Sequence, residues 1–427
     1  MPTDDRSDVL VDGAAEARSD GLQRDAVEAG WDELLGESAV ALAAQLVAID
    51  SVNPGLVPGA AGEATIVEHL RDRLQSNGFT VHVVPAPGRD DRPSLVAIGP
   101  DRPSGPVRPS GPTVVLTGHL DTVGVEGMPE PFVPTVRFGR LTGRGSSDMK
   151  SGVAAMVVAA EELARCEADA RVVLALVADE EDASTGAEAV LAALPGLGVH
   201  PDVAVVGEPT WLAITESLRG YALVEVTLTG RAAHSSQPDQ GVNAVKHLGR
   251  LLVAVEQRDA ELGQGGASLM ATVASGGDSP FVLARSARAL VERRTVPGES
   301  SDVALAEVEQ LLADLRAADP QVDATARLVI TREAWRLDDD GPASSLAAAM
   351  EAALAASASD GVVPQRFSAP YWMEAPLWQA AGTPALVCGP AGGGLHAPDE
   401  WVDLEQVRRY AVALTTAVAR WAAEHAH

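Results

Sequence analysis

The sequence predicts an α/β fold in which a mainly parallel sheet carries helices on both faces and a smaller domain is inserted into the larger one. Three observations predict it. Segments with strand and helix periodicity alternate up to about residue 206. From about residue 216 the order becomes β-α-β-β-α-β, and a helix and a strand of the first type follow after residue 340. A chain of 427 residues is also long for one compact core, so two domains are expected.

The larger domain is predicted from alternating segments, which are typical of parallel strands connected by helices. Sites in such sheets gather at the carboxyl ends of the strands. The expected segments are helices at 39–49 and 64–76, strands at 80–84, 94–98 and 113–117, a helix at 152–165, a strand at 171–178, a helix after Ser184, a strand at 202–206, and, late in the chain, a helix at 343–356 and a strand at 384–388.

The inserted domain is predicted at 216–331, where the order of elements is that of a ferredoxin-like unit. Its expected strands are 221–228, 270–273, 287–293 and 325–331, and its expected helices are 242–257 and 301–317. The first part of the larger domain is then 36–215 and the second part is 332–427. Residues 1–35 are expected to form an N-terminal extension, because they show no apolar periodicity.

Composition excludes several classes of partner. The formal net charge of −28 disfavours nonspecific nucleic-acid binding, which needs Lys and Arg to neutralise phosphates. The apolar runs are strand-sized, so no membrane span is expected, and residues 1–31 hold no stretch typical of a secretion signal. The two cysteines, Cys166 and Cys388, make a disulfide framework unexpected, and we predict a cytoplasmic protein. We attribute the acidity to genome composition or a salt-adapted surface.

A histidine and an aspartate follow the strand expected at 113–117. They are His119 and Asp121. A metal-bound imidazole commonly passes its second ring N–H to a carboxylate or a carbonyl, so the pair suits a metal ligand and its supporting group. The alternative is a loop histidine beside a solvated aspartate.

A glycine-rich segment at 143–152 leads into the helix expected at 152–165. Its glycines permit unusual backbone geometry, and it presents Asp148 just before the helix. The alternative is that Asp148 caps the helix, which is a common role for an aspartate there.

Four consecutive acids, Asp179, Glu180, Glu181 and Asp182, close the apolar strand expected at 171–178. Adjacent carboxylates repel one another unless water or cations compensate them. A neighbouring pair can supply one metal ligand and one general base, which metal-assisted hydrolysis requires. A solvated acidic turn is the alternative.

Two more candidate ligands also come after expected strands. Glu208 follows the strand expected at 202–206, and His396 follows the strand at 384–388 through a glycine-rich stretch. That stretch lacks a following Lys-Ser or Lys-Thr, so we do not expect a phosphate loop. Jointly, two histidines and several carboxylates at strand ends predict a site with nitrogen and oxygen donors, suited to zinc or a similar ion. The sequence lacks the motifs of serine hydrolases and dinucleotide sites, and no cysteine stands in a plausible triad.

Five motifs in a fixed order make the chain resemble the M20 metallohydrolases, from about Ser38 to the C-terminus. The motifs are 118–123, 143–152, 179–181, 207–210 and the late His396. The resemblance implies two zinc ions, for which Co²⁺ or Mn²⁺ substitutes, bridged by Asp148. It also implies a cis peptide bond between Asp148 and Met149.

The same resemblance implies a role for each of the other site residues. The ligands of one metal would be completed by His119 and Glu208, and those of the other by Glu181 and His396. Asp121 would orient His119, and Glu180 would be the general base.

The inserted domain resembles the lid or dimerisation domain of the family. The resemblance implies that His234 stabilises the oxyanion in a neighbouring subunit's active site, and that Asn243 contacts the substrate. Arg294 would bind a substrate carboxylate, because a guanidinium can donate two parallel hydrogen bonds. We therefore expect a homodimer that forms through this domain.

The expected activity is cleavage of the amide bond of an N-acyl amino acid by a metal-activated water, with Glu180 as base. Two alternatives stay open. One is a carboxypeptidase or dipeptidase of the same family that acts on a short peptide, and the other is a non-catalytic metal-binding homologue. The segment at 371–376 departs from many family members, which have Thr-Asp-Ala or Ser-Asp-Gly there, and Trp372 and Met373 make its neighbourhood bulkier. The exact substrate is therefore left undecided.

Overall fold

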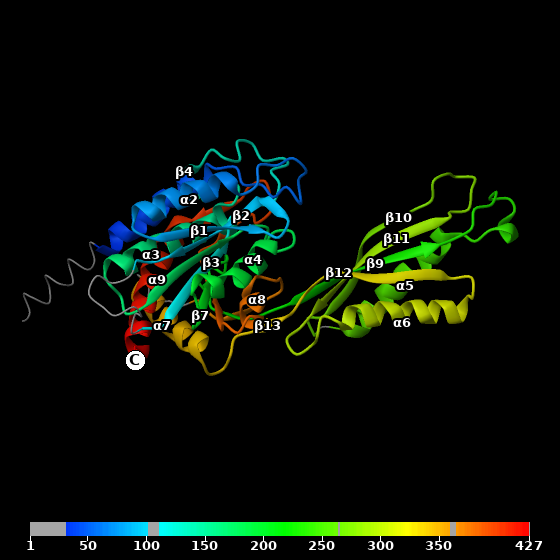
Figure 1. The fold of residues 1–427 in the computed structure, drawn as a ribbon. Helices are drawn as coiled ribbons and strands as arrows, with labels where there is room; N and C mark the ends of the chain where they lie inside the picture. Colours follow the sequence, from blue (N-terminus) through cyan, green and yellow to red (C-terminus); the bar gives the residue numbers. More distant parts are fainter. Residues whose placement is uncertain (1–30, 101–110, 264, 359–363, 427) are drawn as a thin grey trace, which may run out of the picture. The chain divides into compact units, whose positions relative to one another are not determined.

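The computed structural model describes residues 31–100, 111–263, 265–358 and 364–426, which form two compact units (Figure 1). Unit 1 contains the described residues up to Ile214, those of Asp340–Pro364 and those from Leu386 onward. Unit 2 contains Thr215–Asp339 and Gln365–Ala385. The latter segment, expected in the second part of the larger domain, is thus grouped with unit 2. The predicted extension at 1–35 lies almost wholly outside the described residues.

The main sheet of unit 1 has the strand order β1-β2-β6-β3-β7-β15. β3 is parallel to β6 and β7, whereas β2 is antiparallel to β1 and β6. The sheet is therefore mainly parallel, as predicted, and β2 runs against β1, β3, β6 and β7, because the short turn between β1 and β2 can join only antiparallel strands. The bounds are β1 (Thr80–Ala86), β2 (Arg89–Ile98), β3 (Thr113–His119), β6 (Arg171–Val177), β7 (Val203–Val206) and β15 (Ala385–Val387).

Helices pack against this sheet and against one another (Figure 1). α3 contacts β3, β6 and α9, while α2 and α4 contact β1 and β2, and α7 contacts α9. The long helix α9 was not among the expected elements, and Asp403 caps it by accepting the N–H of Glu405 at 2.9 Å. The bounds are α2 (Ala64–Ser76), α3 (Ser151–Arg165), α4 (Thr185–Ala193), α7 (Pro342–Ala356) and α9 (Leu404–His425), and residues 31–47 are also helical.

A small antiparallel sheet joins two segments that lie far apart in the sequence. Its strand order is β16-β17-β5-β4, with β4 at Thr135–Arg137, β5 at Arg140–Thr142, β16 at Gly392–Gly393 and β17 at Trp401–Asp403. Because β17 pairs with β5, the segment that carries His396 lies beside the loop that leads to Asp148. Strands of two or three residues leave no periodic pattern, so the sequence did not predict this sheet.

Gly207, just after β7, is a point of close backbone approach. A Cβ on Gly152, near the start of α3, would lie 2.2 Å from Gly207 O. A Cβ on Gly389, after β15, would lie 2.4 Å from the same atom. Only residues without a side chain allow contact this close. These glycines therefore help to set the positions of the loops that carry Asp148 and Glu208.

Unit 2 contains the elements β9-α5-β10-β11-α6-β12, and its four strands form an antiparallel sheet in the order β10-β11-β9-β12. Alternate residues of β9 are buried, so one face of the sheet packs on the core with α5 and α6. The bounds are β9 (Gly220–Thr229), α5 (Ala244–Leu262), β10 (Ser268–Gly276), β11 (Ser286–Thr295), α6 (Val303–Ala318) and β12 (Asp323–Arg332).

A second sheet of unit 2 has the order β13-β8-β14. Its strands are β8 (Thr215–Leu218), β13 (Trp335–Arg336) and β14 (Phe367–Ala369), and helix α8 (Ala375–Ala380) follows. Across the part of the chain that the structure describes, no helix combines the length and apolar character needed to cross a membrane.

Gly152→Ala should destabilise the protein, because the added methyl group would collide with the Gly207 carbonyl. Overpacking of this kind typically costs about 1–3 kcal/mol. The matched control is Gly196→Ala, where a Cβ would meet nothing within 4 Å. Urea denaturation of both variants measures the difference, and equal midpoints for the two would contradict the packing argument.

Candidate metal site

Five side chains that the sequence predicts as metal ligands converge in unit 1. Three of them end or follow strands of the main sheet, one lies in the turn before α3, and one comes from the late glycine-rich segment. His119 ends β3, Asp148 lies in the turn η1 (Ser146–Lys150), Glu181 and Glu208 follow β6 and β7, and His396 lies between β16 and β17. The carboxyl edge of the sheet thus gathers these side chains, as strand ends in such folds commonly do.

The Asp148 carboxylate lies between two imidazoles. Its Oδ1 is 3.1 Å from His119 Nε2, and its Oδ2 is 3.2 Å from His396 Nε2. Each imidazole also has a carboxylate of its own, since His119 Nε2 lies 3.9 Å from Glu208 Oε1 and His396 Nε2 lies 3.1 Å from Glu181 Oε2. One shared carboxylate between two further sets of donors is a suitable arrangement for two neighbouring cations.

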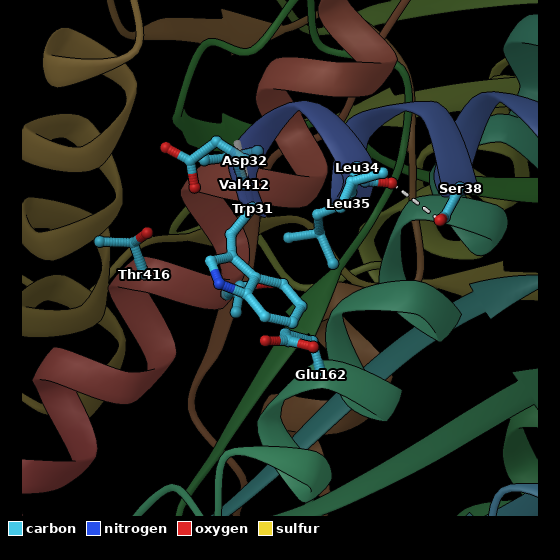
Figure 2. Close-up of a pocket in the computed structure, with 9 residues that line it drawn as sticks. Trp31, Asp32, Leu34, Leu35, Ser38, Glu162, Val412 and Thr416 are labelled. Atoms are coloured by element: carbon cyan, nitrogen blue, oxygen red, sulfur yellow. Dashed lines mark hydrogen bonds between the residues drawn. The ribbon is translucent and has the colours of Figure 1, made fainter. Parts of the chain in front are cut away.

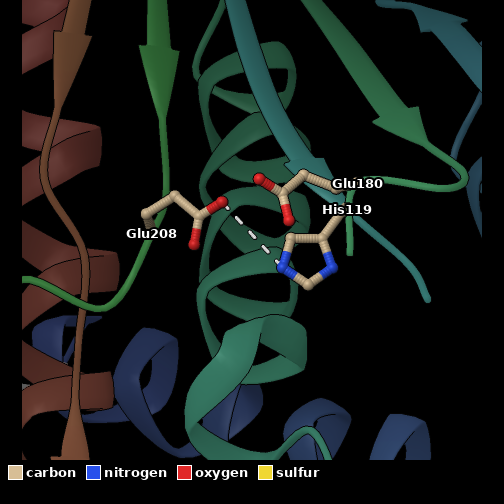
Figure 3. A group of neighbouring side chains, drawn as sticks. All are labelled: His119, Glu180 and Glu208. Atoms are coloured by element: carbon tan, nitrogen blue, oxygen red, sulfur yellow. Dashed lines mark ion pairs between the residues drawn. The ribbon is translucent and has the colours of Figure 1, made fainter. Parts of the chain in front are cut away.

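Glu180 belongs to the same cluster (Figure 3). His119, Glu180 and Glu208 each offer a donor atom within 4.8 Å of the others, and so do His119, Asp148 and Glu181. Figure 3 shows the carboxylates of Glu180 and Glu208 directed toward the His119 ring. Glu180 is therefore close enough to act either as a ligand or as a base beside the ligands.

The backbone around Asp148 is irregular. The peptide bond between Asp148 and Met149 is cis, as the resemblance implied. Gly143 and Gly145 have φ values of 152° and 77°, which L-residues with side chains rarely adopt. Helix α3 begins after Lys150 and has no side-chain cap. The alternative reading of Asp148 as a helix cap is therefore wrong.

Asp121 supports its neighbours through both its main chain and its side chain. The His119 ring nitrogen Nδ1 is 2.9 Å from the Asp121 carbonyl oxygen and 3.6 Å from the carboxylate oxygen Oδ1. The Asp121 carboxylate accepts the N–H of Glu180 at 3.1 Å and that of Glu181 at 3.2 Å. The carbonyl thus orients the imidazole, while the side chain fixes the backbone of the acidic segment.

A buried polar network lies behind this acidic segment. Asn53 donates to Asp121 Oδ2 at 2.7 Å and to Asp179 Oδ1 at 3.2 Å. Arg92 pairs with Asp179 at 2.8 Å and forms two hydrogen bonds to Glu63 at 2.8 and 2.5 Å. The exposed fraction of each of these residues is at most 4%. Asn53, Arg92 and Glu63 could not be predicted from the sequence, because no motif or spacing marks them and they meet only in the folded chain.

Charges within the cluster shift the pKa values of its members. Burial raises the pKa of Glu181, and the nearby charge of Asp148 raises it further. Burial also acts to raise the pKa of Asp148, but hydrogen bonds from His119 and His396 outweigh it and hold that pKa below its usual range. Asp148 and Glu181 raise the pKa of His396 to about 10. The carboxylates therefore favour positive charge at both imidazoles.

The residues present fit zinc. Histidine nitrogens combined with carboxylate oxygens are a donor set that zinc accepts readily. Glu181 Oε1 is a buried acceptor with no hydrogen-bond partner among the described residues. A bound cation would satisfy this oxygen and offset the repulsion between the carboxylates.

Two predicted residues of unit 2 make local contacts. The exposed His234 has its Nδ1 2.8 Å from Ser236 Oγ. Asn243 is the N-cap of α5, and its Oδ1 accepts the N–H of Val245 at 3.1 Å. Its carbonyl oxygen is thus engaged in capping, a role that the sequence analysis did not assign to it.

Arg294 lies on β11, opposite Tyr221 of β9. Its guanidinium stands 5.2 Å from the centroid of the Tyr221 ring and pairs with Glu292 at 2.5 Å. Tyr221 in turn makes an edge contact with Trp372, with 6.0 Å between ring centroids. Trp372, which departs from the family pattern, therefore belongs to the surroundings of Arg294.

A separate pocket of about 180 Å³ lies elsewhere in unit 1 (Figure 2). Trp31 and Leu35 line it on the first described helix, together with Glu162 of α3 and Val412 of α9. None of the predicted site residues lines it. The pocket therefore adds nothing to the chemistry of the acidic cluster.

Comparison with curated proteins agrees with the predicted resemblance. Residues 115–420 match the model of Peptidase family M20/M25/M40. An acetylornithine deacetylase from Myxococcus xanthus is 29% identical over 371 residues, which is 83% of this chain and 92% of that protein. A succinyl-diaminopimelate desuccinylase from Zymomonas mobilis is 32% identical over 227 residues, which is 51% of this chain and 56% of that protein.

Solved structures of low sequence identity share the fold. An M20 family metallo-carboxypeptidase from Sulfolobus solfataricus superimposes with a TM-score of 0.73 at 15% identity, covering 90% of this chain and 99% of that one. A dinuclear metal-binding peptidase of the M20 family from Bacillus subtilis gives a TM-score of 0.68 at 15% identity, covering 92% and 99%.

Arg92→Met should destabilise unit 1 strongly, because it leaves Glu63 and Asp179 buried without their cation. Breaking a buried ion pair from one side typically costs about 3–5 kcal/mol. The loss should shrink as the pH falls, since burial raises the pKa of Glu63 and its protonation removes a charge that Arg92 compensated. Urea denaturation at several pH values measures this, and Arg92→Met/Glu63→Gln should recover part of the loss. A pH-independent deficit without rescue would contradict the charge argument.

Proposed function

Because the chain belongs to Peptidase family M20/M25/M40, we propose that it is a binuclear zinc hydrolase that cleaves the amide bond of an N-acyl amino acid. The observation that carries the proposal is the Asp148 carboxylate between the imidazoles of His119 and His396, at 3.1 and 3.2 Å. The deacylase reading is supported by the similarity to acetylornithine deacetylase and succinyl-diaminopimelate desuccinylase.

We assign Asp148 as the ligand shared by the two zinc ions. His119 and Glu208 complete the ligands of one ion, and Glu181 and His396 complete those of the other. This division is supported by two distances. His396 Nε2 lies 3.1 Å from Glu181 Oε2, and His119 Nε2 lies 3.9 Å from Glu208 Oε1. When bound, the zinc pair would lower the pKa of a water molecule and polarise the substrate carbonyl.

Glu180 is the proposed general base. It takes a proton from the attacking water and returns it to the leaving amine. The backbone of Glu180 is held by the Asp121 carboxylate, which accepts its N–H at 3.1 Å. Asp121 also fixes the His119 ring through its carbonyl oxygen, so one residue positions both the base and a ligand.

Unit 2 is proposed to serve as a ferredoxin-like lid and dimerisation domain. Its strand order, β10-β11-β9-β12, supports this assignment. In the proposed homodimer His234 donates a hydrogen bond to the oxyanion, Arg294 binds the substrate carboxylate, and Asn243 contributes from the start of α5. We further propose that the protein works in the cytoplasm.

Glu180→Gln should lower kcat by about 100- to 10,000-fold while the zinc content stays at the wild-type value, because the amide cannot accept the proton. Elemental analysis and steady-state kinetics measure the two quantities. Loss of zinc in this variant would instead make Glu180 a ligand, and near-normal turnover would remove it from the mechanism.

His396→Ala should lower the zinc content from about two equivalents to about one, because a histidine donor to one ion is lost. The matched control is His200→Ala, an exposed histidine outside the cluster, which should keep both ions. Retention of two zinc ions by His396→Ala would exclude His396 as a ligand.

A panel of N-acetyl and N-succinyl amino acids and of dipeptides, assayed with the zinc-loaded protein, tests the substrate class. We expect hydrolysis of the N-acyl amino acids at the highest kcat/KM. Faster cleavage of dipeptides would favour a peptidase, and turnover of no member would favour a non-catalytic homologue.

A further inference from the structure

We propose that Glu400 is a positioning residue that fixes the spacing between Asp148 and His396, and that it thereby sets the affinity for one of the two cations. The inference rests on the two-metal centre proposed above. It concerns the cation held by His396 and Glu181 more than the cation held by His119 and Glu208.

The Glu400 carboxylate is enclosed by donors from the loop that carries Asp148. Oε1 accepts the N–H of Ser147 at 2.9 Å and that of Asp148 itself at 3.1 Å. Oε2 accepts the N–H of Gly145 at 3.0 Å and a guanidinium N–H of Arg144 at 2.6 Å. The residue is fully buried, so these protein donors replace water around a charged group.

The same carboxylate links two segments that are distant in the sequence. Glu400 lies four residues after His396, whereas its donors lie on the loop around Asp148. Arg144 strengthens the link by donating to the carbonyl of Ala397 at 3.2 Å, and Ser147 Oγ accepts the N–H of Gly392 at 3.2 Å. The distance between Asp148 and His396 therefore depends on these ties.

The two imidazoles depend on this link to different degrees. The His119 side chain is 1% exposed and is oriented by the Asp121 carbonyl, so surrounding contacts fix it. The His396 side chain is 54% exposed, so little packing holds it in place beyond its contacts with Asp148 and Glu181. Its position follows from the position of its backbone, which Glu400 ties to the Asp148 loop.

A carboxylate is required at this position because all four partners are donors. Glu400→Gln replaces one acceptor oxygen by an NH₂ group, which must then face either Arg144 and Gly145 or Ser147 and Asp148. A donor would oppose donors in either orientation, and buried N–H groups would lose their acceptor. The loop should therefore shift even though the side chain keeps its size.

The test is titration of the metal-free full-length protein with Zn²⁺ by calorimetry and with Co²⁺ by visible absorption. Wild type should bind two ions. Glu400→Gln should bind one ion with little change in affinity and the other about 10- to 100-fold more weakly. A loss of this size is common when a residue that supports a metal ligand is altered. At low metal concentration its Co²⁺ spectrum should match that of His396→Ala, which identifies the weakened site.

The matched control is Glu405→Gln, an exposed glutamate on α9 that should keep both affinities. Ser147→Ala removes only the bond to Gly392, and it should weaken the same cation by a smaller factor. Arg144→Lys, which keeps a positive charge but loses the paired guanidinium contacts to Glu400 and to the Ala397 carbonyl, carries the test if circular dichroism shows that Glu400→Gln does not fold.

Wild-type affinity for both ions in Glu400→Gln, or an equal loss at both sites, would overturn the inference. Unchanged binding in Arg144→Lys would also overturn it if Glu400→Gln does not fold. A wild-type protein that binds fewer than two ions would instead refute the proposed function, so the two failures are distinguishable.

Discussion

The concentration of negative charge at the carboxyl edge of one sheet is the constraint on which the site depends. Asp148, Glu181 and Glu208 approach the imidazoles of His119 and His396, and burial makes their mutual repulsion costly. The fold tolerates this because the imidazoles of His119 and His396 lie between the carboxylates and compensate part of their charge. The same crowding favours the binding of cations. The carboxylates that destabilise this edge of the sheet are therefore also the groups suited to hold metal ions.

Two buried carboxylate and arginine pairs hold this edge from different sides. Arg92 lies behind the acidic segment and compensates Glu63 and Asp179. Arg144 binds Glu400 beside the loop of Asp148. In both cases the charged side chains are buried and leave no freedom to reorient, and rigid supporting groups of this kind preorganise the residues that contact metal or substrate. Stability and site geometry therefore depend on the same contacts.

Much of the fold could be predicted from periodicity. The strands of the main sheet and the β-α-β-β-α-β order of unit 2 have long apolar or alternating patterns, and the structure has these elements close to the expected bounds. The antiparallel placement of β2, the small sheet of β16 and β17, and the helix α9 were not predicted. Strand direction depends on how a turn closes, and two-residue strands carry too few residues for a pattern to appear.

The sequence by itself determined which residue types follow each strand, and therefore that His119, Asp148, Glu181, Glu208 and His396 were candidates for one site. The rule that parallel strands end at a common edge predicted this for His119, Glu181 and Glu208, whereas the roles of Asp148 and His396 as ligands were implied by the resemblance to the M20 family. Only the tertiary structure decided the supporting groups, Asn53, Glu63, Arg92, Arg144 and Glu400. Their roles arise from contacts between segments up to 256 residues apart, and no local pattern encodes such a contact.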